Sequence, residues 1–211
     1  AHSIYESEKI NQLYQTSEFK YDAELKNLQE TYGNYLEAID EFSHGKDSFL
    51  EIGCGNGFLL EKALSLGYKN VTGVELSSEA INMAVPGIKE KIIQGAFDPN
   101  NFEDNQFDVI FFAMVIEHVD DVNKFLQGIY RLLKQGGIVL GITHDEGSFL
   151  SAILKDKCPI INDEHIYVFD RVTLSKIFSK NNFAVKKIDD VANIYSLNYW
   201  FKMTPLPKSI Q

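Results

Sequence analysis

A short apolar run that ends in three alternate glycines constrains this chain more than any other feature. Residues 49–52 (Phe-Leu-Glu-Ile) predict a buried strand, Gly53, Gly55 and Gly57 follow at every second position, and a helical pattern comes next. Glycine tolerates positive φ and lets the backbone approach a ligand closely, because it has no Cβ. The start of the helix adds free N–H groups and the positive end of the helix dipole. The segment therefore predicts a ligand cradle at the carboxyl end of a strand, where open α/β sheets bind ligands.

From residue 48 onward, the sequence has the alternating pattern of strands and helices that is typical of an α/β fold. Short runs rich in Val, Ile and Phe alternate with helical patterns, which predicts βαβ units and a parallel sheet covered by helices on both faces. We expect strands at 48–53, 71–75, 91–94, 107–112 and 137–142, helices at 57–66, 78–84, 122–134, 147–155 and from Asp170 or Thr173 to about Lys180, and two further strands at 183–190 and around 193–200.

The first 47 residues differ from the rest. They contain Tyr5, Tyr14, Tyr21, Tyr32 and Tyr35, half of the ten tyrosines. Apolar positions recur at spacings of three and four over 22–42, so that this segment predicts an amphipathic helix. We accordingly divide the chain into a helical cap or lid over 1–47 and a core over 48–211.

Composition excludes several classes of function. The net charge of −10 opposes nucleic-acid binding. Two cysteines, Cys54 and Cys158, are too few for a disulfide framework or a four-thiolate zinc site. No apolar run approaches the roughly 20 residues of a membrane helix, and the N-terminus has no signal-peptide pattern. We therefore expect a cytoplasmic protein without a membrane span or a nucleic-acid partner.

The glycine pattern distinguishes between ligand classes. A dinucleotide fingerprint needs G-x-G-x-x-G, but position 58 is Phe, and no Lys-Ser/Thr pair follows as in a phosphate-binding Walker loop. The sequence Glu51-x-Gly53-x-Gly55-x-Gly57 instead resembles the first motif of class I S-adenosylmethionine-dependent methyltransferases. A tight turn without a ligand is the structural alternative.

Four further segments resemble the same family, in the same order. Glu75 ends the second strand about 20 residues beyond the glycines, where an acid can accept the hydroxyls of a ribose. Residues 92–98 resemble the segment that brackets adenine, 106–119 the fourth strand with its Glu-His pair, and 131–140 the helix–Gly-Gly–strand unit. The likeness covers about 48–145. A weaker one at 164–174 is to small-molecule and sugar methyltransferases.

The resemblance implies a Rossmann-like, doubly wound, seven-stranded mixed sheet with an N-terminal helical cap and an acceptor-side insert at about 145–170. It implies S-adenosyl-L-methionine as cofactor and S-adenosyl-L-homocysteine as product, with the ammonium group on Glu51, the ribose on Glu75 and the adenine between Ala96 and Phe97. Ala96 departs from the family, which often has an acid there, and either Asp98 or the backbone of Ala96 and Phe97 is the expected substitute. The residues implied to bind the cofactor are Glu51, Gly53, Cys54, Gly55, Gly57, Glu75, Leu76, Gly95, Ala96, Phe97, Ala113, Met114 and His118.

Three histidines are candidates for catalysis. A hydroxyl acceptor needs a base to take its proton, and His118, His144 and His165 follow expected strands or lie in a loop after them. Each of these histidines also has a non-catalytic interpretation, as a residue at a helix start, in the packed core or on the surface. Asp145 or Glu117 is expected to orient one of the rings. No His-x-x-x-His spacing predicts a zinc site, so we expect no metal ligands. A loose divalent site from His and carboxylates stays open as an alternative.

The predicted function is methyl transfer from S-adenosylmethionine to a small molecule, at a hydroxyl of a sugar or of a biosynthetic intermediate. Three alternatives remain open: N-methylation of a small amine or a protein, an NAD(P)-dependent oxidoreductase, and a non-catalytic cofactor-binding subunit. The expected partner is the small-molecule acceptor, and a homodimer with a second copy of the chain is left open.

Overall fold

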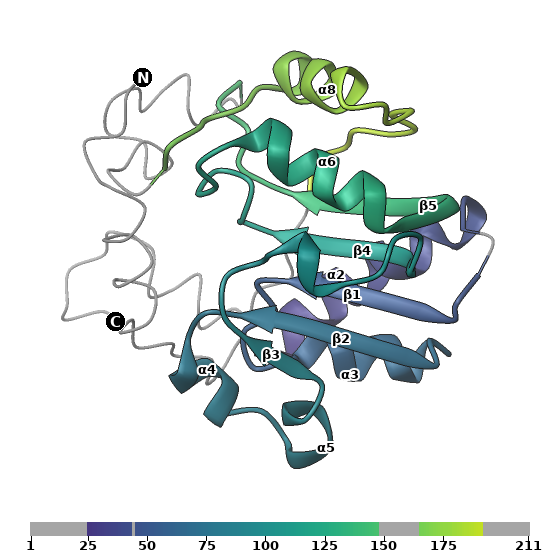
Figure 1. Ribbon diagram of the computed structural model, residues 1–211, viewed down its shortest axis with the longest axis vertical. Helices are drawn as coiled ribbons and strands as arrows, with labels where there is room; N and C mark the ends of the chain where they lie inside the picture. The colour runs from purple at the N-terminus through teal and green to yellow at the C-terminus, as the bar shows by residue number, and fades with distance from the viewer. Residues whose placement is uncertain (1–24, 44, 148–164, 192–211) are drawn as a thin grey trace, which may run out of the picture.

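A computed structural model describes residues 25–43, 45–147 and 165–191 of the chain. Its centre is a sheet of five parallel strands in the order β3-β2-β1-β4-β5, seen side by side in Figure 1. The strand order reverses beside β1, which makes the carboxyl ends of β1 and β4 the switch point where doubly wound sheets bind ligands. The strands are β1 (Ser48–Ile52), β2 (Asn70–Glu75), β3 (Ile92–Gln94), β4 (Phe107–Ala113) and β5 (Leu133–Ile142).

Helices connect these strands and cover the sheet (Figure 1). Among the described residues, no helix combines the length and the apolar character that crossing a membrane requires. The helices are α2 (Leu25–Ala38), η1 (Ile39–Glu41), α3 (Phe58–Ser65), α4 (Ser78–Asn82), α5 (Pro86–Lys89), η2 (Pro99–Asn101), α6 (Val122–Leu132) and α8 (Arg171–Lys180).

Alternate residues of the central strands pack into two separate cores. On β4, Ile110 and Phe112 pack into a cluster with the apolar stripe of α6 and, at its margin, α8. The intervening Val109 and Phe111 face a second cluster formed by α2 and α3. All four side chains are at most 1% exposed. Since successive side chains of a strand point to opposite faces, β4 is buried on both sides, as its unbroken apolar sequence predicted.

The N-terminal helix packs directly on this body. The Tyr32 ring of α2 lies 6.0 Å from that of Phe58 and 5.6 Å from that of Phe111, centroid to centroid. Tyr32 therefore has the packing role that is the plain reading of a tyrosine on an amphipathic helix. Tyr5, Tyr14 and Tyr21 lie outside the described residues, and the division into a cap over 1–47 and a core over 48–211 stays a prediction.

The expected strand at 183–190 is wrong. These residues are described and form no strand, and most of their side chains are exposed. Phe183 instead packs its ring against Phe178 of α8 and against Tyr130 of α6. A strand exists only when its N–H and C=O groups pair with a neighbour, and no such neighbour lies among the described residues. The expected strand around 193–200 and nearly all of the expected helix at 147–155 lie outside them, so the described sheet has five parallel strands rather than seven mixed ones.

The glycine turn lies at the carboxyl ends of the strands. At their amino-terminal ends, Asp108 links the starts of β1, β4 and β5. Its Oδ2 accepts hydrogen bonds from the Asp47 amide (3.0 Å), the Ser48 amide (2.8 Å) and the Lys134 ammonium (2.9 Å). The side chain is only 13% exposed. Burial opposes ionisation of Asp108, but the hydrogen bonds from Lys134 and Ser48 outweigh it and lower the pKa of the carboxyl.

We predict that Asp108→Asn lowers the free energy of unfolding by about 1–3 kcal/mol at pH 7, because charged hydrogen bonds of β1 and β5 are lost. Because folding lowers the pKa, the ionised carboxylate stabilises the protein above its ordinary value of 3.8. That contribution is lost as the pH falls through the folded value, so the difference between the two proteins shrinks there. Urea unfolding at several pH values measures both effects.

The matched control is Asp104→Asn, because Asp104 is 61% exposed and forms only a surface ion pair with Arg131. We expect this change to leave the unfolding midpoint in place. Equal unfolding midpoints for the two variants would contradict the role of Asp108.

Candidate active site

The three glycines form the tight turn that their spacing predicts. Gly53, Gly55 and Gly57 have φ values of 75°, 55° and 74°, in the left-handed region that favours glycine. The Gly53 and Cys54 amides both donate to the carbonyl of Val74, at 2.8 and 3.1 Å, which ties the turn to β2. Gly57 is the N-cap of α3. The turn therefore lies at the carboxyl end of β1, with the start of α3 directly behind it.

Glu75, at the end of β2, holds this turn in place. Its Oε2 accepts a hydrogen bond from the Gly55 amide and its Oε1 accepts one from the Ser77 amide, both at 2.8 Å. The side chain is 8% exposed. Spacing along the sequence predicted that Glu75 lies beside the glycines, and the structure adds that its carboxylate bonds to their backbone. Ribose binding by Glu75 stays a prediction.

Glu51 brings a second buried carboxyl to the same place. It lies on β1 and is 3% exposed, and its Oε2 has no hydrogen-bond partner. Burial, reinforced by the charge of Glu75, raises the pKa of Glu51 well above its ordinary range. Burial, together with Glu51 and Glu75, also raises the pKa of the Cys54 thiol. A buried carboxyl without a partner fits a cationic group of a ligand, because a positive charge would satisfy the free oxygen and stabilise its ionised form.

The other residues predicted to bind the cofactor follow the ends of β2, β3 and β4. The Gly95 amide donates to the Glu75 carbonyl at 2.8 Å, which places 95–97 beside the end of β2. The ring of Phe97 packs against Phe102 and Phe125. Adenine contacts of Asp98, or of the backbone of Ala96 and Phe97, stay a prediction. Leu76 follows Glu75 directly, and Ala113 and Met114 end β4 and begin the next turn.

Met114 has an unusual backbone. Its φ is 54°, which is uncommon for a residue other than glycine, and its amide donates to the Ile142 carbonyl at 2.8 Å. Strained backbone of this kind gathers at functional sites. The sequence placed Met114 near the cofactor, but nothing in it signalled the strained turn.

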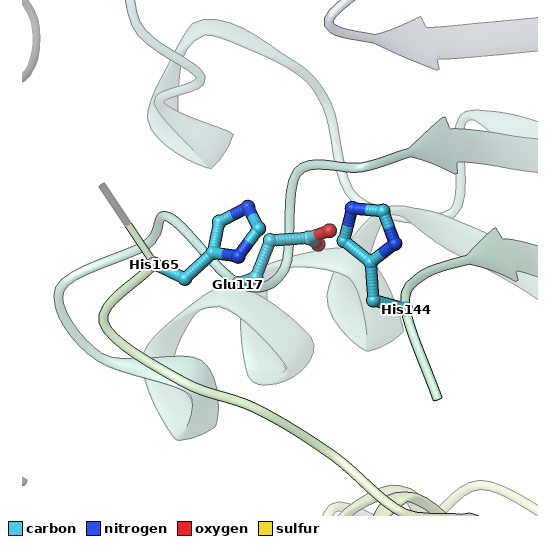
Figure 2. Close-up of side chains that lie close together, drawn as sticks. All are labelled: Glu117, His144 and His165. Atoms are coloured by element: carbon cyan, nitrogen blue, oxygen red, sulfur yellow. The ribbon is translucent and has the colours of Figure 1, made fainter. Parts of the chain in front are cut away.

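The three candidate histidines come together at the ends of β4 and β5, and Figure 2 shows two of them, His144 and His165, beside Glu117. The ring centroids of His118 and His165 lie 4.8 Å apart, and those of His144 and His165 lie 5.2 Å apart. The carboxylate of Glu117 lies among them: one ligand atom each of Glu117, His144 and His165 lies within 4.8 Å of the others. Residues from three separate segments thus form one group, which we call the histidine cluster (Glu117, His118, His144 and His165).

Glu117 anchors the histidine cluster. It is 1% exposed, and its Oε2 accepts a hydrogen bond from the Thr143 hydroxyl at 3.0 Å. Its backbone carbonyl accepts from the amides of Ile166 and Tyr167, at 2.8 and 3.1 Å, which holds the segment of His165 against β4. Sequence reasoning considered Glu117 as an orienting residue but had no signal for Thr143 or for this backbone tether. Asp145, the other orienting candidate, forms an ion pair with Arg171.

Burial determines the charge states within the cluster. It raises the pKa of Glu117, against the hydrogen bonds from its own backbone and from Thr143 and against the charge of His165. It also lowers the pKa of His144, and His165 lowers that value further. His144 is therefore a neutral imidazole at pH 7, the form that accepts a proton.

Known proteins resemble this chain both in sequence and in fold. The sequence profile of a family described as "Methyltransferase domain" matches residues 25–188. A ubiquinone biosynthesis O-methyltransferase of Pelagibacter ubique is 31% identical over 166 residues, which are 74% of this chain and 68% of the relative. One from Nitrosomonas europaea is 31% identical over 143 residues, 63% of this chain and 60% of the relative. The chain thus spans about two thirds or less of the length of these relatives.

Solved structures share the architecture. A SAM-dependent methyltransferase from Aquifex aeolicus superposes with a TM-score of 0.58 at 20% identity, over 89% of this chain and 93% of that one. A phosphoethanolamine N-methyltransferase of Haemonchus contortus, solved in complex with S-adenosyl-L-methionine, gives 0.56 at 22% identity, over 82% of this chain and 44% of that one. At such identities the likeness shows the fold, and the profile match over most of the chain shows the family. The chain belongs to the class I S-adenosylmethionine-dependent methyltransferases, with S-adenosylmethionine as its cofactor.

Proposed function

We propose that the protein methylates a hydroxyl oxygen of a small biosynthetic intermediate. The observation that carries this proposal is the histidine cluster at the carboxyl ends of β4 and β5, where a neutral imidazole is available to take a proton. An oxygen acceptor needs such a base, because a hydroxyl is a poor nucleophile until its proton leaves. The O-methyltransferase name of the relatives at 31% identity supports the same reading.

The cofactor would occupy the glycine turn. When bound, S-adenosylmethionine supplies a methyl group that the positive charge on its sulfur activates. Glu51 would bind the ammonium group, and its free Oε2 is the acceptor available for it. Glu75 would bind the ribose while it keeps the Gly55 amide in place. The chain's main task is then to orient two reactants and exclude water, which accounts for a large part of the catalysis of such transfers.

Within the cluster, we assign the proton transfer to His144. Its imidazole is half-buried and held neutral, and it follows β5 directly. His165 lies against both other rings, so that it and Glu117 position them. The acceptor would then lie between the cluster and the switch point of the sheet.

The alternatives make different demands on the same residues. A neutral amine needs little more than desolvation, so N-methylation would not depend on His144. The family match excludes the NAD(P)-dependent oxidoreductase, which the missing third glycine of the dinucleotide fingerprint already disfavoured. A hydroxyl of a sugar remains a second class of acceptor. The net charge of −10 disfavours nucleic acid as the methyl acceptor.

We predict that Glu75→Ala weakens the binding of S-adenosylmethionine by about 1–3 kcal/mol, the size of a lost charged hydrogen bond. Titration calorimetry with S-adenosylmethionine, S-adenosylhomocysteine and NAD measures the change. Glu90→Ala is the control, because Glu90 is an exposed glutamate at the end of α5. Unchanged affinity in Glu75→Ala would remove Glu75 from the site. Binding of NAD alone by the unmodified protein would refute the proposed reaction.

A second prediction concerns the proton acceptor. With labelled S-adenosylmethionine and a panel of phenols, sugars and amines, we expect methyl transfer to a hydroxylated compound. Its rate should rise with pH and level off, with a midpoint below the ordinary histidine value of 6.5, because burial lowers the pKa of His144. His144→Gln should lower kcat by about 10²–10⁴-fold, the usual contribution of a general base.

The affinity for S-adenosylhomocysteine is the internal control for His144→Gln, and we expect it to stay unchanged. Methyl transfer to an amine that survives in His144→Gln would favour N-methylation over the proposed reaction. A midpoint above 6.5 would show that another group takes the proton.

A further inference from the structure

We propose that Glu117, His144 and His165 form a binding site for a divalent transition-metal ion such as Zn²⁺. The three side chains offer one carboxylate oxygen and two imidazole nitrogens from different segments of the chain (Figure 2). The three ligands have no regular spacing in the sequence that would predict a metal site. The turn after β4, the segment after β5 and the segment before α8 each contribute one of them. The site adjoins the proposed acceptor position, but its existence does not depend on methyl transfer.

The distances suit an ion after a small adjustment. One ligand atom from each side chain lies within 4.8 Å of the other two. Ligand atoms around Zn²⁺ lie roughly 2.0–2.2 Å from the metal, and therefore about 3.3–3.6 Å from one another in a tetrahedral site. The ligand atoms would therefore have to approach one another by up to about 1.5 Å, and the two imidazoles among them are only half-buried.

A second observation points to a cation at the same place. Glu117 is 1% exposed, and its Oε1 has no hydrogen-bond partner. Buried polar atoms nearly always have a partner, so an unsatisfied carboxyl oxygen that faces two imidazoles requires an explanation. A bound cation would satisfy this oxygen.

Groups behind the ligands are already arranged to orient them. The Thr143 hydroxyl donates to Oε2 of Glu117 at 3.0 Å, which leaves Oε1 for the ion. The amides of Ile166 and Tyr167 bond to the Glu117 carbonyl and so fix the backbone beside His165. Hydrogen bonds of this kind orient the ligands in known metal sites.

The donor types select the class of metal. Imidazole nitrogens suit zinc, iron, copper and nickel, whereas Mg²⁺ and Ca²⁺ prefer oxygen ligands alone. Three protein ligands leave at least one coordination position open, as in catalytic rather than structural zinc sites. The ligand class for that position is a hydroxyl oxygen, and an acceptor with two adjacent oxygens could fill two positions. The proton transfer that we assign to His144 then applies to the metal-free protein, because an imidazole that binds the ion cannot also take the proton.

The test is titration of the chelator-treated chain of residues 1–211 with Zn²⁺ by calorimetry, and with Co²⁺ by visible absorption. We expect one ion per chain and a Co²⁺ spectrum typical of nitrogen and oxygen ligands. Glu117→Gln, His144→Asn and His165→Asn should each weaken binding by at least about 10–100-fold, which is the effect of losing even a supporting residue. His118→Gln is the matched control, because it removes an imidazole of the cluster but none of the three ligands, and it should keep the affinity.

Binding of S-adenosylhomocysteine by each variant shows that it is folded, which matters most for the buried Glu117. Absence of Zn²⁺ and Co²⁺ binding would overturn the metal site, and so would binding that survives all three ligand substitutions. Because these titrations contain no acceptor, a protein that methylates a hydroxyl but binds no metal would refute this inference alone. A protein that binds the ion but transfers no methyl group would refute only the proposed function.

Discussion

The hydrogen bond from the Gly55 amide to the buried Glu75 carboxylate is the contact on which the rest of the site depends. It joins the turn after β1 to the end of β2, and the second oxygen of the same carboxylate fixes the Ser77 amide at the start of α4. Three positive-φ glycines make the turn sterically accessible, but they do not choose its conformation. The side chain of Glu75 restricts it, because a carboxyl that is only 8% exposed needs hydrogen-bond donors and the Gly55 and Ser77 amides supply them.

The strand order separates two acidic centres that have different tasks. Glu51 and Glu75 lie at the ends of β1 and β2, and Glu117 follows β4. On the first side, the carboxyls crowd each other and a free oxygen of Glu51 faces no donor, which suits a cationic cofactor. On the second side, the carboxyl lies among imidazoles, which suits proton transfer or a metal ion. The switch point of the sheet lies between them, so cofactor and acceptor can approach from opposite sides.

Sequence reasoning succeeded where local signals determine the structure. The five strands follow from apolar runs, of which those of β1 and β4 are buried on both faces, and the glycine turn and Glu75 follow from a spacing of about 20 residues. The expected strand at 183–190 is absent because it has no pairing partner among the described residues, and Phe183 packs against α8 instead. His165 could be a candidate but could not be placed, since its position depends on the backbone bonds of Ile166 and Tyr167 to Glu117.

The central claim is that the glycine turn and the histidine cluster face one another across a bound cofactor. A crystal structure with S-adenosylhomocysteine tests it most directly. We expect the amino-acid end of S-adenosylhomocysteine to lie at Gly53–Gly57, with its ammonium group on Glu51 and its ribose on Glu75. The open side of its sulfur should face His144. A sulfur that faces away from the cluster, or a ligand bound outside the turn, would contradict it.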